Sequence, residues 1–162
     1  LHSQLVALDF VPPLVALELE AAAAVADPFG DLIEAARREG RVVAEADGVV
    51  ALVPPAPRQP FETWLLPVEQ AAFFHAAPPR QVAAVADLTR WFVERLERLV
   101  PGAAYNWWLH QPPHRPPAAA AAWHWHLEIL PRLAQLAGFE LGTGCHVTSL
   151  SAEEAARRLR EA

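Results

Sequence analysis

The run of residues 123–132 constrains the fold of this chain most, because its residue types alternate with the period of a β-strand. Successive side chains of a strand point to opposite faces of a sheet. One predicted face therefore carries three titratable side chains, His124, His126 and Glu128. The other predicted face carries the apolar residues Trp125, Leu127 and Ile129. Three metal-binding or proton-transferring groups on one face indicate that the chemistry of the protein is concentrated here.

Length and composition narrow the class of protein. With 162 residues, of which 53% are hydrophobic, the chain is long enough for one well-cored domain. Its net charge of −6 argues against a nucleic-acid-binding protein, which normally has a basic face. No apolar run reaches the ~20 residues of a membrane-spanning helix. A single cysteine, Cys145, excludes an internal disulfide, so we expect a cytoplasmic protein with this thiol buried and inert.

Local patterns predict an α+β fold. The strongest signals are a hairpin turn at Asp47-Gly48, a long helix at 80–99 and a capping box that begins at Ser151. The predicted strands are 4–11, 41–46, 49–53, 61–66, 104–110 and 123–130. The predicted helices are 12–25, 31–38, 80–99 and a last one after Ser151. Hairpin-type connections between strands indicate an antiparallel sheet with helices packed on it.

Two motifs are specific enough to indicate a family, namely the segments 124–132 and 138–144. Weaker matches support them at 30–34, 41–45, 51–54, 60–67, 105–106 and 109–110. Together they resemble the C-terminal half of the galactose-1-phosphate uridylyltransferases, which belong to the histidine-triad superfamily. The resemblance implies a histidine-triad-like antiparallel sheet over 26–162. It also implies that 1–25 is the end of the active strand of an N-terminal half followed by a linking helix. The absence of methionine, even at position 1, agrees with a piece of a longer protein.

The resemblance gives a role to the first residues of the chain. Family members carry a His-Pro-His-x-Gln motif, whose second histidine attacks the α-phosphorus of a UDP-sugar and forms a covalent uridylyl-histidine. His2-Ser3-Gln4 matches the end of this motif, although Leu1 stands in place of the proline. His2 is therefore the implied nucleophile, and Gln4 is the implied hydrogen-bond donor to phosphate. The alternative is that His2 is a frayed terminal residue.

A metal site is implied by the same resemblance. His124 and His126 share a strand face and His110 ends the neighbouring predicted strand, so three imidazoles can converge. The family has a zinc or iron site of three such histidines and a glutamate fourteen residues after the active-site glutamine, which is Glu18 here. This donor set suits zinc or ferrous iron. The alternative is that the histidines form hydrogen bonds within the sheet without a metal.

The third position of the histidine motif departs from the common pattern. Typical histidine-triad hydrolases use the middle histidine, here His126, as nucleophile and have a third histidine where this chain has Glu128. This loss fits a half-domain that keeps the fold while the other half carries the catalysis. His126 accordingly remains the main rival of His2 and is not assigned the nucleophilic role.

The segment 137–143 resembles the loop that, in dimeric family members, reaches into the partner subunit and lines the hexose pocket. By position, the implied substrate contacts are Phe139, Leu141 and Thr143, and the implied assembly is a homodimer. The aromatic and acidic pair expected to bind galactose is absent, because Thr143-Gly144 stand there. The specificity of an ADP-glucose-type phosphorylase, or for another sugar nucleotide, is therefore open. The alternative reading of the segment is a Gly-rich turn.

Two functions follow from these observations. The first is a nucleotidyltransferase resembling the UDP-glucose–hexose-1-phosphate uridylyltransferase of galactose metabolism. It would move a nucleoside monophosphate between sugar 1-phosphates through a covalent nucleotidyl-histidine, with a sugar nucleotide and a sugar 1-phosphate as its partners. The second is a non-catalytic histidine-triad-like module, or an enzyme fragment, that retains a metal or nucleotide pocket.

Overall fold

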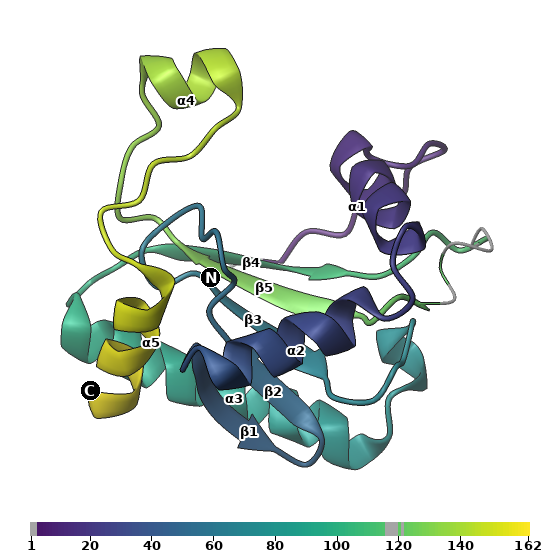
Figure 1. The fold of residues 1–162 in the computed structure, drawn as a ribbon, viewed down its shortest axis with the longest axis horizontal. Helices are drawn as coiled ribbons and strands as arrows, with labels where there is room; N and C mark the ends of the chain where they lie inside the picture. The colour runs from purple at the N-terminus through teal and green to yellow at the C-terminus, as the bar shows by residue number, and fades with distance from the viewer. Residues whose placement is uncertain (1–2, 116–119, 121) are drawn as a thin grey trace.

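The fold is built on an antiparallel sheet of five strands in the order β1-β2-β3-β5-β4 (Figure 1). The computed structural model describes residues 3–115, 120 and 122–162. The strands are β1 Val42–Ala46, β2 Val49–Leu52, β3 Thr63–Pro67, β4 Tyr105–His110 and β5 His126–Pro131. The predicted α+β class, with helices on an antiparallel sheet, is confirmed.

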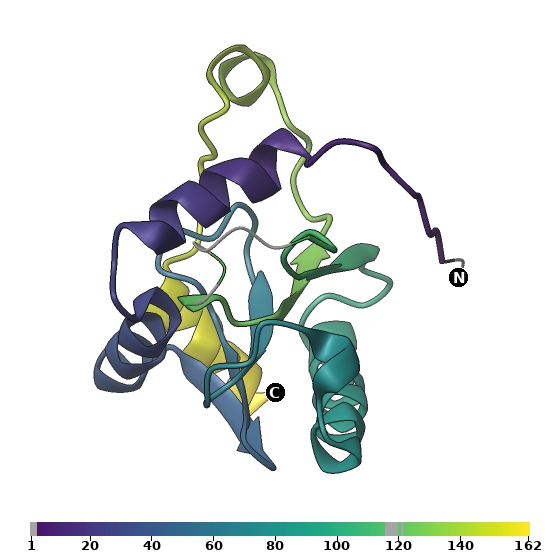
Figure 2. The same cartoon turned by 90° about the vertical axis from the view of Figure 1, so that its right-hand side faces the viewer.

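Helices cover both faces of this sheet (Figures 1 and 2). The helices are α1 Pro13–Ala23, α2 Pro28–Arg38, the 3-10 turn Phe74–Ala76, α3 Pro79–Leu99, α4 Gly138–Thr143 and α5 Ala152–Glu161. Helices α3 and α5 pack on one face, whereas α1 and α2 lie over the other. Helix α4 projects from the body on two extended segments (Figure 1). No helix among the described residues is long and apolar enough to cross a bilayer.

Each face of the sheet has its own apolar core. The core under α3 and α5 includes Leu65, Phe92, Leu96, Trp125, Leu127, Ile129 and Leu159. The core under α1 and α2 includes Leu19, Phe29, Ile33, Val50, Leu52, Leu66 and Trp123. The alternation at 123–132 therefore has the predicted effect, since Trp125, Leu127 and Ile129 fill one core while the titratable side chains face the opposite side.

Several local predictions are confirmed by the backbone. Asp47 and Gly48 both have positive φ angles, 46° and 77°, as a two-residue type I′ hairpin turn requires. Helix α3 spans the predicted 80–99, and α5 begins after Ser151, whose Oγ accepts a hydrogen bond from the Glu154 N–H at 3.2 Å. Helix α2 starts one turn before the predicted residue 31, because Asp27 caps it through the Gly30 N–H at 3.0 Å.

Other predictions are wrong. Residues 4–11 form no strand; they run away from the sheet (Figure 2), and Leu5 is fully exposed, so in this structure no neighbouring strand takes up their hydrogen bonds. Strand β5 begins at His126 rather than at Trp123, because the Trp125 N–H donates to Ala71 O instead of joining the ladder. The predicted loop after Ala137 contains helix α4. Cys145 is exposed, not buried.

The burial of helix α3 predicts that truncating its buried and its exposed side chains will have unequal effects on stability. Phe92 is 1% exposed in the core under α3 and α5, whereas Val82 of the same helix is 42% exposed. Phe92→Ala should lower the free energy of unfolding by about 3–5 kcal/mol through lost burial and a cavity. Val82→Ala is the control and should change it by about 0.5 kcal/mol or less. Urea unfolding measures both, and equal losses would contradict this packing.

Candidate metal centre

Four titratable side chains meet where α1 crosses the β4–β5 pair. They are Glu18 of α1, His110 of β4, and His126 and Glu128 of β5. One ligand atom from each lies within 4.8 Å of the others. The sheet register creates half of this arrangement, because His110 and His126 are directly opposite each other on neighbouring antiparallel strands.

His126 lies at the middle of the cluster and is 0% exposed. Its Nδ1 is 3.0 Å from the carbonyl oxygen of His124, and a carbonyl only accepts, so Nδ1 carries the proton. Its Nε2 then points at the carboxylates, 2.9 Å from Glu18 Oε1 and 3.5 Å from Glu128 Oε1. Despite these short distances, Nε2 has no well-directed hydrogen bond and is an orphaned buried atom. A lone pair facing two carboxylates needs a positive charge between them.

The pKa values of Glu18, His126 and Glu128 are shifted in the directions that this need for a positive charge predicts. Burial alone would raise the pKa of Glu18, but its close contacts with the imidazoles of His110 and His126 lower it to about 2. Burial would lower the pKa of His126, but Glu128 and Glu18 raise it to about 9. Burial likewise opposes ionisation of Glu128, yet His126 and Arg58 lower its pKa. Without a metal, the site keeps both carboxylates ionised by holding a proton on His126.

The same geometry also suits a divalent cation. Two imidazoles and two carboxylates are a donor set suited to zinc or ferrous iron. A doubly charged ion neutralises both carboxylates and gives the orphaned Nε2 of His126 a partner. His110 fits as well, since its Nδ1 is 2.8 Å from Glu18 Oε2 and 3.7 Å from Glu128 Oε1. The four residues can therefore bind such an ion.

His124 lies outside this cluster, although the family resemblance implies that it is a ligand together with Glu18, His110 and His126. It precedes β5, and its Nδ1 is 3.0 Å from the carbonyl oxygen of Pro67. Its Nε2 is 3.8 Å from Asp27 Oδ1, and its ring stacks on Phe29. Glu128 occupies the fourth position instead. The strand alternation did place Glu128 on the face of His126, so the signal was present in the sequence.

The other predicted site residues that the structure describes lie apart from the cluster. His2 falls outside the described residues. Gln4 is exposed in the segment 3–11, which runs away from the sheet (Figure 2). Phe139 and Leu141 are 56% and 73% exposed on the projecting helix α4. Thr143, at the end of the same helix, donates its hydroxyl hydrogen to Phe139 O at 2.7 Å. The roles of these five residues in catalysis and substrate binding therefore remain predictions.

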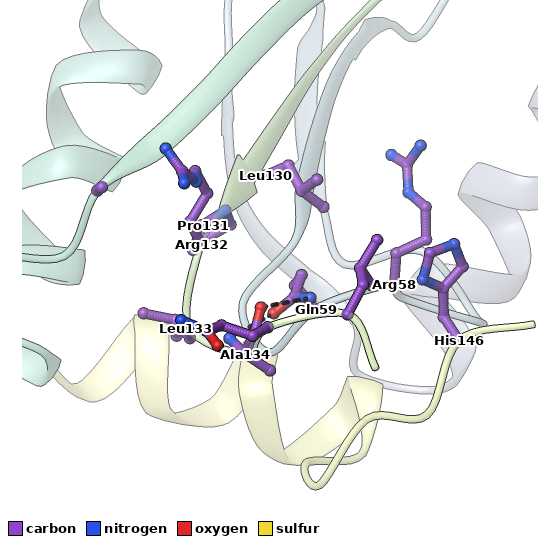
Figure 3. A pocket seen from close by; sticks show the side chains of 11 residues that line it. Arg58, Gln59, Leu130, Pro131, Arg132, Leu133, Ala134 and His146 are labelled. Carbon is purple, nitrogen blue, oxygen red and sulfur yellow. Dashed lines mark hydrogen bonds between the residues drawn. The ribbon is translucent and has the colours of Figure 1, made fainter. Parts of the chain in front are cut away.

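A cavity of about 630 Å³ lies at the base of the α4 arm (Figure 3). Its wall combines the cationic side chains of Arg58 and Arg132, the imidazole of His146 and apolar groups such as Leu130. Gln59 closes one side through hydrogen bonds with the backbone of Ala134. Arg58 belongs to both this cavity and the cluster, because its guanidinium also pairs with Glu128.

Comparison with known proteins agrees with the sequence resemblance. No family model matches the chain. The chain is 29% identical over 163 residues to the ADP-glucose phosphorylase of Arabidopsis thaliana, covering 99% of the chain and 46% of that protein. The crystal structure of an Arabidopsis thaliana ADP-glucose phosphorylase with bound ADP-glucose superimposes with a TM-score of 0.86 at 27% identity, over 96% of this chain and 51% of the other.

A solved uridylyltransferase gives the same result, with a TM-score of 0.85 at 26% identity over 95% of this chain and 52% of that one. The chain is a homologue of ADP-glucose phosphorylase and of GalT-like uridylyltransferases. It spans about half the length of these relatives, so the predicted match to their C-terminal half is confirmed. A histidine triad family protein from Mycobacterium smegmatis, with a TM-score of 0.58 at 18% identity, supports the predicted histidine-triad-like fold alone.

The geometry predicts which side chains determine metal affinity. Titration of the metal-free chain with Zn²⁺ should give one tight site, and His126→Ala or Glu128→Gln should weaken it, because each removes a donor from the cluster. His124→Ala is the informative control and should bind Zn²⁺ like the parent chain. Calorimetry with circular dichroism to check folding measures all three. Loss of binding in His124→Ala with retention in Glu128→Gln would restore the donor set of the sequence analysis.

Proposed function

We propose that this chain is part of a nucleotidyltransferase that moves a nucleoside monophosphate from a sugar nucleotide to a sugar 1-phosphate. The observation that carries the proposal is the 29% identity to ADP-glucose phosphorylase along 99% of the chain. The superposition on a relative with bound ADP-glucose supports a sugar nucleotide as the substrate class. The whole activity extends beyond the matched part, since the chain spans 46% of that relative.

The proposed reaction proceeds in two displacements. An imidazole nitrogen of His2 attacks the α-phosphorus of the sugar nucleotide, a nitrogen–phosphorus bond forms, and the bond to the bridging oxygen breaks. The leaving group is a sugar 1-phosphate, which takes the electron pair of the broken bond. A second sugar 1-phosphate then attacks the nucleotidyl-histidine and releases the imidazole. The Gln4 amide donates a hydrogen bond to a phosphoryl oxygen, which positions phosphorus for both steps.

The metal centre serves this reaction as a structural clamp. Glu18 is the contribution of α1 to the cluster, and α1 directly follows the segment that contains His2 and Gln4. A zinc or iron ion bound by Glu18, His110, His126 and Glu128 would tie α1 to β4 and β5 and supply a fixed positive charge. Holding α1 to the sheet limits where the catalytic segment can reach, because Pro12-Pro13 stiffen its junction with α1.

The acceptor and the sugar distinguish two versions of this function. Similarity to ADP-glucose phosphorylase favours inorganic phosphate as an acceptor beside sugar 1-phosphates, whereas a role in galactose metabolism requires UDP-glucose and galactose 1-phosphate. The exposed apolar side chains of the α4 arm, Phe139 and Leu141, support a homodimer in which this arm contacts the substrate bound by the partner subunit. We place this reaction in the cytoplasm.

The covalent step is tested directly by intact mass spectrometry. The chain is incubated with ADP-glucose or UDP-glucose, beside His2→Asn and the matched control His75→Asn, an exposed histidine elsewhere. We expect a nucleoside-monophosphate adduct in the parent chain and in His75→Asn, and none in His2→Asn. Addition of glucose 1-phosphate or phosphate should discharge the adduct and identify the acceptor.

Two results would contradict the proposal. An adduct that survives in His2→Asn and disappears in His126→Asn would move the nucleophile to His126. The absence of an adduct with both sugar nucleotides, in a folded chain that binds Zn²⁺, would favour the non-catalytic metal-binding module.

A further inference from the structure

A closed ring of interacting side chains adjoins the metal cluster and shares two residues with it. It runs from Glu128 through Arg58, Glu62 and Trp64 to His126, and Glu128 and His126 are both members of the cluster. Arg58 and Glu62 lie in the loop before β3 and belong to neither the cluster nor the predicted catalytic segment. Their role therefore needs an explanation of its own.

The two carboxylate oxygens of Glu128 have different partners. Oε1 faces the cluster, 3.5 Å from His126 Nε2 and 3.7 Å from His110 Nδ1. Oε2 accepts a hydrogen bond from the Arg58 guanidinium. The side chain of Glu128 is 4% exposed, so water does little to orient it. The contact with Arg58 consequently holds one oxygen of the carboxylate so that the other faces the cluster.

Arg58 is in turn held by Glu62, whose side chain is 1% exposed. Glu62 Oε1 accepts from Arg58 Nη2 at 2.5 Å, and Oε2 accepts from the Arg58 backbone N–H at 2.5 Å. The guanidinium also lies over the ring of Trp108, 5.2 Å from its centroid. A planar guanidinium bound on several sides in this way has little rotational freedom.

The sheet register places two tryptophans beside Glu128. Trp64 of β3 and Trp108 of β4 are the residues directly opposite Glu128 on its two neighbouring strands. Trp64 donates its indole N–H to Glu62 Oε1 at 2.9 Å and stacks on His126 with ring centroids 5.1 Å apart. The neighbours of Glu128 in the sheet therefore fix the same arginine and the same imidazole.

The backbone before β3 carries strain that serves this arrangement. Phe61 is buried and has a φ angle of 66°, a conformation that is costly for a bulky side chain. This turn precedes Glu62 and brings its carboxylate back to the Arg58 N–H four residues earlier. A strained turn at the base of an ion-pair network indicates that the position of Glu62 matters to the site.

We propose that Arg58, held by Glu62 and Trp108, is a positioning residue that orients Glu128 and thereby raises the affinity of the cluster for a divalent cation. Ligating carboxylates elsewhere are held by such partners, and losing one typically costs about 10–100-fold in metal affinity. The inference rests on the metal centre of the proposed function and not on nucleotidyl transfer. Arg58 acts through geometry, because its positive charge by itself would repel the cation.

The deciding variant is therefore Arg58→Lys, which keeps the charge and removes the planar fork. Its matched control is Arg37→Lys, because Arg37 also binds two carboxylates, Glu34 and Glu45, on the surface away from the cluster. Metal-free chains are titrated with Co²⁺ and Zn²⁺ against a chromophoric chelator, and the visible spectrum of bound Co²⁺ reports the donor geometry. We expect about 10–100-fold weaker binding and an altered Co²⁺ spectrum for Arg58→Lys, and parental behaviour for Arg37→Lys.

Trp108→Leu provides a second route to the same answer if Arg58→Lys does not fold. It removes only the stacking partner of the guanidinium at a partly exposed position and should weaken Co²⁺ binding in the same direction. Parental affinity and spectrum in a folded Arg58→Lys or Trp108→Leu chain would overturn the proposal. Since no sugar nucleotide is present, failure of nucleotidyl transfer leaves this result unaffected.

Discussion

The site depends on one buried imidazole that faces two carboxylates. His126 donates from Nδ1 to the His124 carbonyl oxygen and directs Nε2 at Glu18 and Glu128. A buried carboxylate pair is costly unless a positive charge compensates it. The cluster can meet this requirement with a proton on His126 or with a divalent ion, and the ion also provides the bonding partner that Nε2 lacks.

The sheet register and helix α1 together hold this arrangement in place. Antiparallel register places His110 opposite His126 and sets Trp64 and Trp108 beside Glu128. Helix α1 brings Glu18 over the same strands, and its apolar residues Leu19 and Ala22 pack into the core under α1 and α2. The proposed catalytic segment precedes α1 in the chain. A cation bound by the cluster would therefore link the docking of α1 to the reach of that segment through Glu18.

The elements that the sequence predicted well are those determined by local rules. The hairpin at Asp47-Gly48 and the helix at 80–99 follow from turn chemistry and from a 3.6-residue period. The prediction of a strand at 4–11 is wrong, because an apolar alternation does not reveal whether a neighbouring strand exists. His110 and His126 could be paired from adjacent predicted strands, whereas Glu18 came from the family resemblance.

The partners of Glu128 could not be predicted from the sequence, for a different reason. Glu128 itself lies on the predicted face as a group able to bind a metal, but the family resemblance gives the fourth ligand position to His124. Arg58 and Glu62 are four residues apart in a loop, and the chain between them turns through the left-handed backbone of Phe61. Arg58 then meets Glu128 across seventy positions of the chain. No periodicity or spacing predicts such a contact.

The most direct test of the account is a crystal structure of the metal-loaded chain with anomalous data collected at the zinc or iron absorption edge. We predict one strong anomalous peak within bonding distance of Glu18, His110, His126 and Glu128, with Arg58 still bound to the outer oxygen of Glu128. A peak bonded to His124 in place of Glu128 would contradict the donor set. A cluster without an anomalous peak, in a chain shown to contain the metal, would contradict the metal centre itself.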